Sequence, residues 1–299
     1  MKEKIKQLVV ISGKGGTGKT VITAAFAGLA ENKVMADTDV DAADLHILLD
    51  PKILKKQEFK AGRTAKIVQD KCIQCGKCLT ACRFEAIQVL KKGGQTEKII
   101  IDPISCEGCA FCGNICPVQA ILMEDNMSGE WYISDTKYGP FVHAKLGIAE
   151  ENSGKLVSVV RQNAKLIAEE KGCKLIIIDG PPGIGCPVIS SISGVDGVLI
   201  VTEPTLSGKH DMIRVAELTR HFKIKTFVIV NKYDLNQNVS DDIEAYCKAN
   251  EIIFSGKISF DPIITKALIN RKNIIEYSDG IVTKQIKDIW GKLKEEMNL

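Results

Sequence analysis

Short apolar runs recur along the chain, and each ends in glycine or in polar residues. The runs cover residues 8–11, 33–36, 174–178, 197–201 and 226–230. Continuous runs rich in β-branched residues are typical of strands buried on both faces of a parallel sheet. A helix is expected from about residue 19 to residue 30, and apolar residues recur at helical spacing from residue 282 to residue 297. We therefore predict an α/β fold, with a mostly parallel sheet and helices on both faces.

Between the first two strands and the later ones, the composition changes and becomes rich in cysteine. Short apolar segments at residues 87–90 and 98–101 flank a break at Lys91-Lys92-Gly93-Gly94. Cysteine runs of the form C-x2-C-x2-C-x3-C lie on either side of this break, and each precedes a short apolar segment, which makes an internal repeat. We predict an inserted small α+β domain over residues 59–130, with residues 1–58 and 131–299 forming the larger domain.

The spacing of the cysteines is that of a bacterial ferredoxin with two [4Fe-4S] clusters, in which the fourth cysteine of each run binds the other cluster. The predicted ligands of cluster 1 are Cys72, Cys75, Cys78 and Cys116, and those of cluster 2 are Cys106, Cys109, Cys112 and Cys82. Zinc is the competing interpretation, because paired C-x2-C spacings also bind Zn²⁺. Arg83 departs from the pattern, since proline is expected after Cys82 as it is after Cys116. With so few apolar residues, this segment must draw much of its folding energy from the metal.

A phosphate-binding loop follows the first strand. Its residues are Gly13, Lys14, Gly15, Gly16, Thr17, Gly18, Lys19 and Thr20. Glycines let backbone N–H groups converge on phosphate oxygens, and the helix that follows adds the positive end of its dipole. We expect Lys19 to reach the β- and γ-phosphates and Thr20 to hold Mg²⁺.

Acidic residues follow two of the predicted strands. Asp37, Asp39, Asp41 and Asp44 follow the second strand, and Asp179 ends the run at 174–178 before Gly180-Pro181-Pro182-Gly183. Carboxylates at strand ends beside a phosphate loop can orient water or hold Mg²⁺, and we expect Asp179 to be the Mg²⁺-linked one. The alternative for the first group is an acidic surface turn, with Asp44 as a helix cap. Residues 231–234, Asn-Lys-Tyr-Asp, are a candidate base-recognition loop.

Composition limits the binding partners and the cellular compartment that we expect for this chain. The chain has 299 residues, is 45% apolar and carries a net charge of +3, which gives no reason to expect nucleic-acid binding. Eleven cysteines without a leading apolar segment indicate a reducing, cytoplasmic protein. No apolar run is long enough to span a membrane. Cys173, Cys247 and the histidines (His46, His143, His210 and His221) are expected to be packing or surface residues.

Three motifs of this chain resemble those of the MinD/ParA/Mrp ATPases, a group with a deviant Walker A loop. They are the loop from Lys14 to Thr20, Asp37-x-Asp39 and Asp179-Gly-Pro-Pro-Gly. The chain resembles most closely the MinD-superfamily ATPases with an inserted ferredoxin domain. This resemblance implies a homodimer that closes on ATP, with Lys14 reaching the nucleotide of the opposite subunit, Asp39 orienting water and Asn231 contacting adenine. It also implies slow ATP hydrolysis.

Three functions remain open at this point. The first is nucleotide-gated assembly or transfer of iron-sulfur or related metal cofactors to an apo client protein. The second is ATP-gated electron donation to a redox partner, and the third is a MinD/ParA-like spatial organiser, which leaves eight cysteines without a role. Cys186 is either a buried thiol or a site of cluster handover. The C-terminal helix is expected to pack on its own domain rather than to bind lipid.

Overall fold

The computed structural model describes residues 4–92, 95–147 and 153–299. The chain divides into two compact units, which are described separately. The first comprises Met1–Gln57, Trp131–Lys145 and Ser153–Leu299, and the second comprises Glu58–Glu130 and Leu146–Asn152. The boundaries at Gln57 and Glu130 fall within two 16-residue strands, β3 and β6.

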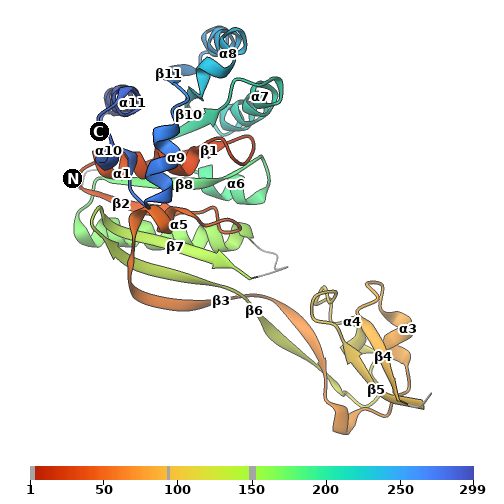
Figure 1. Ribbon diagram of the computed structural model, residues 1–299. Helices are drawn as coiled ribbons and strands as arrows, with labels where there is room; N and C mark the ends of the chain where they lie inside the picture. The colour runs from red at the N-terminus through yellow and green to blue at the C-terminus, as the bar shows by residue number, and fades with distance from the viewer. Residues whose placement is uncertain (1–3, 93–94, 148–152) are drawn as a thin grey trace. The chain divides into compact units, whose positions relative to one another are not determined.

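A nine-stranded sheet has the order β11-β10-β9-β1-β8-β2-β7-β6-β3 (Figure 1). From β11 to β7 each neighbouring pair is parallel, so the carboxyl ends of these strands lie at one edge. The strands are β1 (Lys6–Ser12), β2 (Lys33–Asp37), β3 (Lys52–Ile67), β6 (Ile121–Thr136), β7 (Gly139–Leu146), β8 (Leu175–Pro182), β9 (Gly197–Thr202), β10 (Lys225–Asn231) and β11 (Ile253–Ile258).

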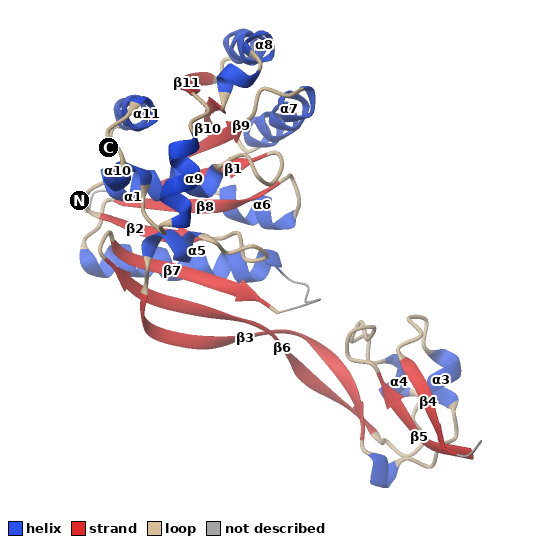
Figure 2. Ribbon diagram, viewed as in Figure 1, coloured by secondary structure: helices blue, strands red, loops and turns tan. Residues whose placement is uncertain are grey.

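Helices cover both faces of this sheet in the first unit (Figure 2). They are α1 (Lys19–Leu29), α2 (Leu45–Leu49), α5 (Ser153–Lys171), α6 (Cys186–Ile192), α7 (Leu206–His221), α8 (Gln237–Ala249), α9 (Pro262–Ile269), α10 (Ile274–Tyr277) and α11 (Ile281–Met297), with a 3₁₀ turn, η2 (Tyr233–Leu235). Leu8 and Val10 of β1 join the core formed with α1 and α11, while the alternate residues Val9 and Ile11 are also fully buried. Burial on both faces is the physical reason for the continuous apolar runs.

The predicted parallel α/β fold is therefore confirmed for this part of the chain, with small shifts at the element ends. In α11, Val282, Ile286, Ile289, Leu293 and Met297 are buried in the core, as expected for a helix that packs on its own domain. No helix among the described residues combines the length and apolar character that crossing a membrane requires.

The second unit is built around a small two-stranded antiparallel sheet, β4 (Ile87–Lys92) with β5 (Gln95–Ile101). Gly93 and Gly94 of the predicted break lie outside the described residues. Short helical segments precede each strand region: η1 (Gln69–Lys71), α3 (Lys77–Ala81) and α4 (Phe111–Asn114). Its core holds Ala65, Ile67, Cys78, Ile87, Ile99 and Ile121, and partly buried cysteines pack against it.

The sequence repeat in this unit is also a repeat of backbone conformation. Positive φ angles occur at Gln74 and Gly108 (55° and 64°), at Gly76 and Ala110 (72° and 62°), and at Glu85 and Gln119 (52° and 49°). Each pair has the same offset as Cys72 and Cys106. Both cysteine runs therefore fold into the same loop shape.

Candidate functional site

The phosphate-binding loop connects β1 to α1. Gly16 and Gly18 have φ angles of 82° and 89°, which favour glycine. A Cβ on Gly18 would lie 2.5 Å from the Asn231 side-chain nitrogen, so glycine is also needed for close packing. Asn231 Nδ2 donates a hydrogen bond to the Thr17 carbonyl at 2.8 Å. Asn231 therefore stabilises the phosphate-binding loop by a hydrogen bond to its backbone, and its predicted contact with adenine stays a prediction.

A cavity of about 660 Å³ opens beside the loop. Its lining includes Gly15–Val21 from the loop and α1, and Pro181 and Pro182 from the end of β8. The carboxylates of Asp39, Asp41 and Asp44 line the same cavity. The cavity thus joins the predicted phosphate-binding residues to the acidic segment after β2, although these residues are far apart in sequence.

Lys19 is the centre of a buried charge cluster at this edge of the sheet. Its Nζ lies 3.0 Å from Asp39 Oδ2 and 3.2 Å from Asp179 Oδ1, and the three side chains are 7%, 11% and 1% exposed. Asp179 Oδ1 also accepts a hydrogen bond from Thr23 Oγ1 at 3.0 Å. Thr23 lies one turn after Lys19, and sequence reasoning did not single it out.

The pKa values in this cluster follow from burial and from the neighbouring charges. Burial alone lowers the pKa of Lys19, but the charges of Asp179, Asp39 and Asp37 outweigh it and raise that pKa. Burial raises the pKa of Asp39, and it raises the pKa of Asp37 well above its usual range. Three carboxyl groups, those of Asp37, Asp39 and Asp179, therefore lie near the ammonium group of Lys19.

Asp37 and Asp44 have roles that differ from the sequence expectation. Asp44 lies at the start of α2 but makes no side-chain capping bond. Instead, the fully buried Asp37 accepts hydrogen bonds from the backbone N–H groups of Asp39 (3.0 Å) and Leu45 (3.2 Å). Asp37 thus shapes the loop that presents Asp39, while Asp44 occupies the N-cap position of α2 without the capping bond that the alternative interpretation gave it.

Two buried oxygen atoms at this site have no hydrogen-bond partner among the described residues, Asp179 Oδ2 and Thr17 Oγ1. Leaving a buried carboxylate oxygen without a partner is costly, so such atoms indicate a ligand site. Thr20, the predicted Mg²⁺ ligand, lines the same cavity. Oxygen donors of this kind suit Mg²⁺, so the residues present fit a magnesium-bound nucleotide.

Lys14 lies outside this cavity lining, and its side chain contacts one residue in the loop after β9 and one in the first turn of α7. Its Nζ contacts Ser207 Oγ at 3.4 Å and Glu203 Oε2 at 3.7 Å. Glu203 also pairs with Lys232 at 2.6 Å. Glu203, which follows β9, therefore connects the phosphate loop to the loop after β10, a role that the sequence did not reveal.

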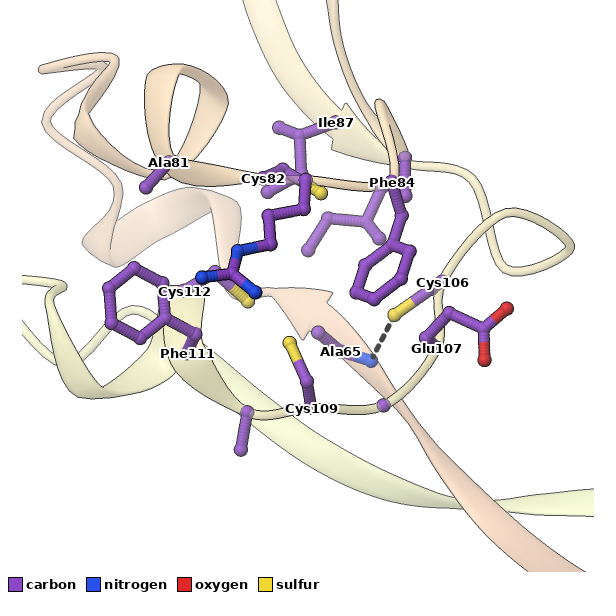
Figure 3. A pocket seen from close by; sticks show the side chains of 15 residues that line it. Ala65, Ala81, Cys82, Phe84, Ile87, Cys106, Glu107, Cys109, Phe111 and Cys112 are labelled. Carbon is purple, nitrogen blue, oxygen red and sulfur yellow. Dashed lines mark hydrogen bonds between the residues drawn. The ribbon is translucent and has the colours of Figure 1, made fainter.

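The eight cysteines of the second unit line two cavities, and each cavity takes one of the predicted sets of four. Cys82, Cys106, Cys109 and Cys112 line a cavity of about 270 Å³, in which Figure 3 shows the four sulfur atoms facing a common space. Cys72, Cys75, Cys78 and Cys116 line a second cavity of about 20 Å³. The fold thus brings Cys82 to the second run and Cys116 to the first.

Backbone N–H groups point at cysteine sulfurs in both sets. Ala65 N donates to Cys106 Sγ at 3.5 Å, and Ala120 N donates to Cys116 Sγ at 3.3 Å. Burial raises the pKa of the Cys78 and Cys112 thiols, which favours their neutral form. Within the described part of the chain, no three His, Cys, Asp or Glu side chains converge closely enough to hold one metal ion.

The other cysteines lie apart from these cavities. Cys173 and Cys247 are buried in the first unit, as expected for packing residues. Cys186 is exposed at the start of α6, so of the two alternatives given for it the buried thiol is wrong.

A glycine-rich loop between a buried strand and a helix, with carboxylates at the ends of two adjoining strands, defines a P-loop nucleoside triphosphatase. The chain belongs to the family of CobQ/CobB/MinD/ParA nucleotide binding domains, whose model matches residues 8–274. It is an ATP-binding NTPase of the MinD/ParA type, and its site fits ATP with Mg²⁺.

The chain is also similar to individual relatives and to solved structures. The chain is 35% identical over 295 residues to the uncharacterized protein MJ0578 of Methanocaldococcus jannaschii, covering 97% of each chain. It is 23% identical to the uncharacterized ATP-binding protein MJ0547 of the same organism, covering 96% of this chain and 86% of the relative. Among solved structures, it is similar to the septum site-determining protein MinD from Pyrococcus horikoshii complexed with Mg-ADP. The TM-score is 0.56 at 16% identity, with 98% of this chain and 97% of that chain covered, which shows a shared fold.

Proposed function

We propose that this protein is an ATPase that carries two [4Fe-4S] clusters on an inserted ferredoxin-like domain, residues 59–130. Its nucleotide state would gate the assembly or transfer of iron-sulfur or related metal cofactors to client proteins. The proposal rests on how the cysteines are divided between the two cavities, since each cavity is lined by three cysteines of one run and the fourth cysteine of the other. That crossed division is the ligand pattern of two-cluster ferredoxins.

The spacing of the cysteines along the chain favours clusters over zinc. Paired C-x2-C spacings bind Zn²⁺, whereas a C-x2-C-x2-C-x3-C run that occurs twice, the second time followed by Pro117, is more typical of cluster ligands. The N–H groups of Ala65 and Ala120 would stabilise the thiolate charge of a bound cluster.

In the first unit, we assign the phosphate loop to the triphosphate of ATP. Lys19 would neutralise the β- and γ-phosphates, and Thr20 and Asp179 would hold Mg²⁺, which stabilises charge on the transferred phosphoryl group. Asp39 would orient water for attack once the phosphates draw Lys19 away from it. The Asp39 to Lys19 distance of 3.0 Å supports this role, since the two groups already share one site.

Closure into a homodimer would use Lys14. Its bond to Ser207 is long, at 3.4 Å, and its side chain is 35% exposed, so little holds it in place. We propose that Lys14 leaves Ser207 and Glu203 and reaches the nucleotide of a second copy when ATP binds.

Electron donation to a redox partner is the second candidate. It is favoured by the exposure of one cysteine in each set, Cys75 and Cys109, which would bring each cluster close to solvent. A MinD/ParA-like spatial organiser has the support of the fold alone.

Transfer of labelled iron distinguishes these functions. The full chain is reconstituted anaerobically with labelled iron and mixed with an apo-ferredoxin acceptor, with and without Mg-ATP. About eight irons per chain should bind, and ATP should accelerate transfer of label to the acceptor. Iron that stays on the protein while electrons pass would support the redox role, and stoichiometric zinc without iron would overturn both.

A further inference from the structure

The two cysteine cavities of the second unit are lined by equivalent positions of the repeat. Two residues are equivalent when they have the same offset as Cys72 and Cys106. Every position that lines the smaller cavity has its equivalent in the lining of the larger cavity. The volumes of about 20 Å³ and 270 Å³ therefore differ because of the side chains at these positions. The larger cavity is the one with Cys82, Cys106, Cys109 and Cys112, and the smaller cavity is the one with Cys72, Cys75, Cys78 and Cys116.

One pair of equivalent positions differs simply in size. Ala65 lines the larger cavity, and Ile99 lines the smaller one at the equivalent position. Both are buried, at 7% and 2% exposed, so neither side chain turns out into solvent. Ala65 borders the space that the sulfur atoms face (Figure 3). The additional carbon atoms of isoleucine fill space beside the cysteines of the smaller cavity, and the larger cavity lacks them.

The larger cavity also has more charged side chains in its lining. Arg83 and Glu107 stand there at positions where the smaller cavity has Pro117 and Ile73. Among the described residues, Lys77 is the one charged side chain that lines the smaller cavity. Charged groups keep water close to them, and proline fixes the backbone directly after the fourth cysteine. The larger cavity is therefore both wetter and less constrained.

These differences bear on how readily a bound cluster is exchanged. Exchange requires an incoming thiolate to approach an iron while a cysteine thiolate leaves it. The shell around a metal site controls this access. Unfilled space beside a cluster also removes van der Waals contacts that would hold it. Both effects weaken retention in the larger cavity relative to the smaller one.

We propose that the larger cavity holds the cluster that is passed to client proteins, whereas the cluster in the smaller cavity stays on the chain. This inference rests on the proposed transfer function and identifies the site of the cargo. In the transfer, the four bonds between iron and the cysteines of the larger cavity break, and four form to thiolates of an apo acceptor. The acceptor thiols release the protons that the freed cysteines take up, and no electrons are exchanged.

Release of iron to an excess of a coloured chelator tests the proposal on the full chain after anaerobic reconstitution. Release should occur in two phases of about four irons each, with rate constants that differ by about 10-fold or more. The iron that remains in Cys116→Ser should leave in the fast phase, and the iron that remains in Cys82→Ser should leave in the slow phase. A single phase for all the iron, or the opposite assignment of the phases, would overturn the proposal.

Reciprocal substitutions at the pair of buried positions provide an independent test. Ala65→Ile should slow the fast phase, and Ile99→Ala should accelerate the slow phase, each leaving the other phase unchanged. Leu122→Ala is the control, since Leu122 is exposed and lines neither cavity, and it should change neither phase. Unchanged rates in both reciprocal variants would contradict the role given to cavity size.

Transfer to an apo-ferredoxin acceptor separates this proposal from the function on which it rests. About four irons should remain on the wild-type chain after transfer, and the chelator should then remove them in the slow phase. Transfer of all the iron, or of the slowly released iron, would overturn the proposal and leave cluster transfer intact. Failure to bind iron, or binding without any transfer, would overturn the proposed function itself.

Discussion

Replacing Lys19 with methionine tests whether the buried charge cluster is balanced by this one cation. Lys19 lies 3.0 Å from Asp39 and 3.2 Å from Asp179, and none of the three side chains is more than 11% exposed. Methionine keeps the length of the side chain but removes the charge. Removing one partner of a buried ion pair typically costs about 3–5 kcal/mol.

Proton binding sets a ceiling on this cost. A carboxyl group with an ordinary pKa of 3.8 can be protonated at pH 7 for about 4 kcal/mol, at 1.36 kcal/mol per unit. The variant can therefore neutralise one unpaired carboxylate by protonation at that cost. Because burial already raises the pKa of Asp39, the expected loss at pH 7 is about 3–4 kcal/mol.

The sign of the pH dependence follows from the same argument. In Lys19→Met the folded-state pKa values of Asp37 and Asp39 lie further above the unfolded value, so the folded state binds more protons than the unfolded state. Stability lost at pH 7 should return as the pH falls, by up to about 1.4 kcal/mol per unit for each carboxylate. The variant should also lose nucleotide binding at all pH values, since the phosphates lose their cation.

Urea unfolding followed by tryptophan fluorescence measures the effect, because both tryptophans, Trp131 and Trp290, lie in the first unit. Lys165→Met is the matched control, since Lys165 forms an exposed pair with Glu169 at 4.0 Å and its loss should change stability by less than about 0.5 kcal/mol. Lys19→Met/Asp179→Asn should recover part of the stability but no nucleotide binding. A loss below about 1 kcal/mol at pH 7, or an equal loss at pH 5.5, would refute the reasoning.

Three further predictions concern the cysteines, the dimer and pH. Cys82→Ser and Cys116→Ser should each lower reconstituted iron from about eight to about four per chain. The control variant Cys186→Ser should leave the iron content unchanged, and loss of iron from it equal to that of the other two variants would contradict the assignment of the cluster ligands. Lys14→Ala should abolish ATP-dependent dimerisation in light scattering and slow hydrolysis, with iron content retained, and unchanged hydrolysis would remove the trans-acting role. Burial, together with the charge of His46, lowers the pKa of His143 from 6.5 to about 4. The unfolded state then binds the extra proton, so stability should fall by about 3 kcal/mol as the pH drops from 6.5 to 4; His143→Gln should lack this slope in chemical unfolding at each pH.

Local chemistry explains why much of the fold could be predicted. The apolar runs before Gly13 and before Asp179 needed no long-range information, because a strand covered on both faces has few polar positions. The phosphate-binding loop could also be predicted from local sequence, because the positive φ angles at Gly16 and Gly18 favour glycine. The long strands β3 and β6 were not predicted, because β3 is largely polar and exposed and β6 mixes polar with apolar residues after its first three.

What the sequence by itself determined is the set of reactive groups: a phosphate loop, acidic strand ends and two cysteine runs with ferredoxin spacing. Only the tertiary structure decided which of them meet. It brought Lys19 between Asp39 and Asp179, placed Asn231 behind the phosphate loop, and gave each cavity three cysteines from one run and one from the other. The reason is physical: spacing along a chain limits local conformation, whereas contacts between distant residues depend on how strands order in a sheet and on what they bury.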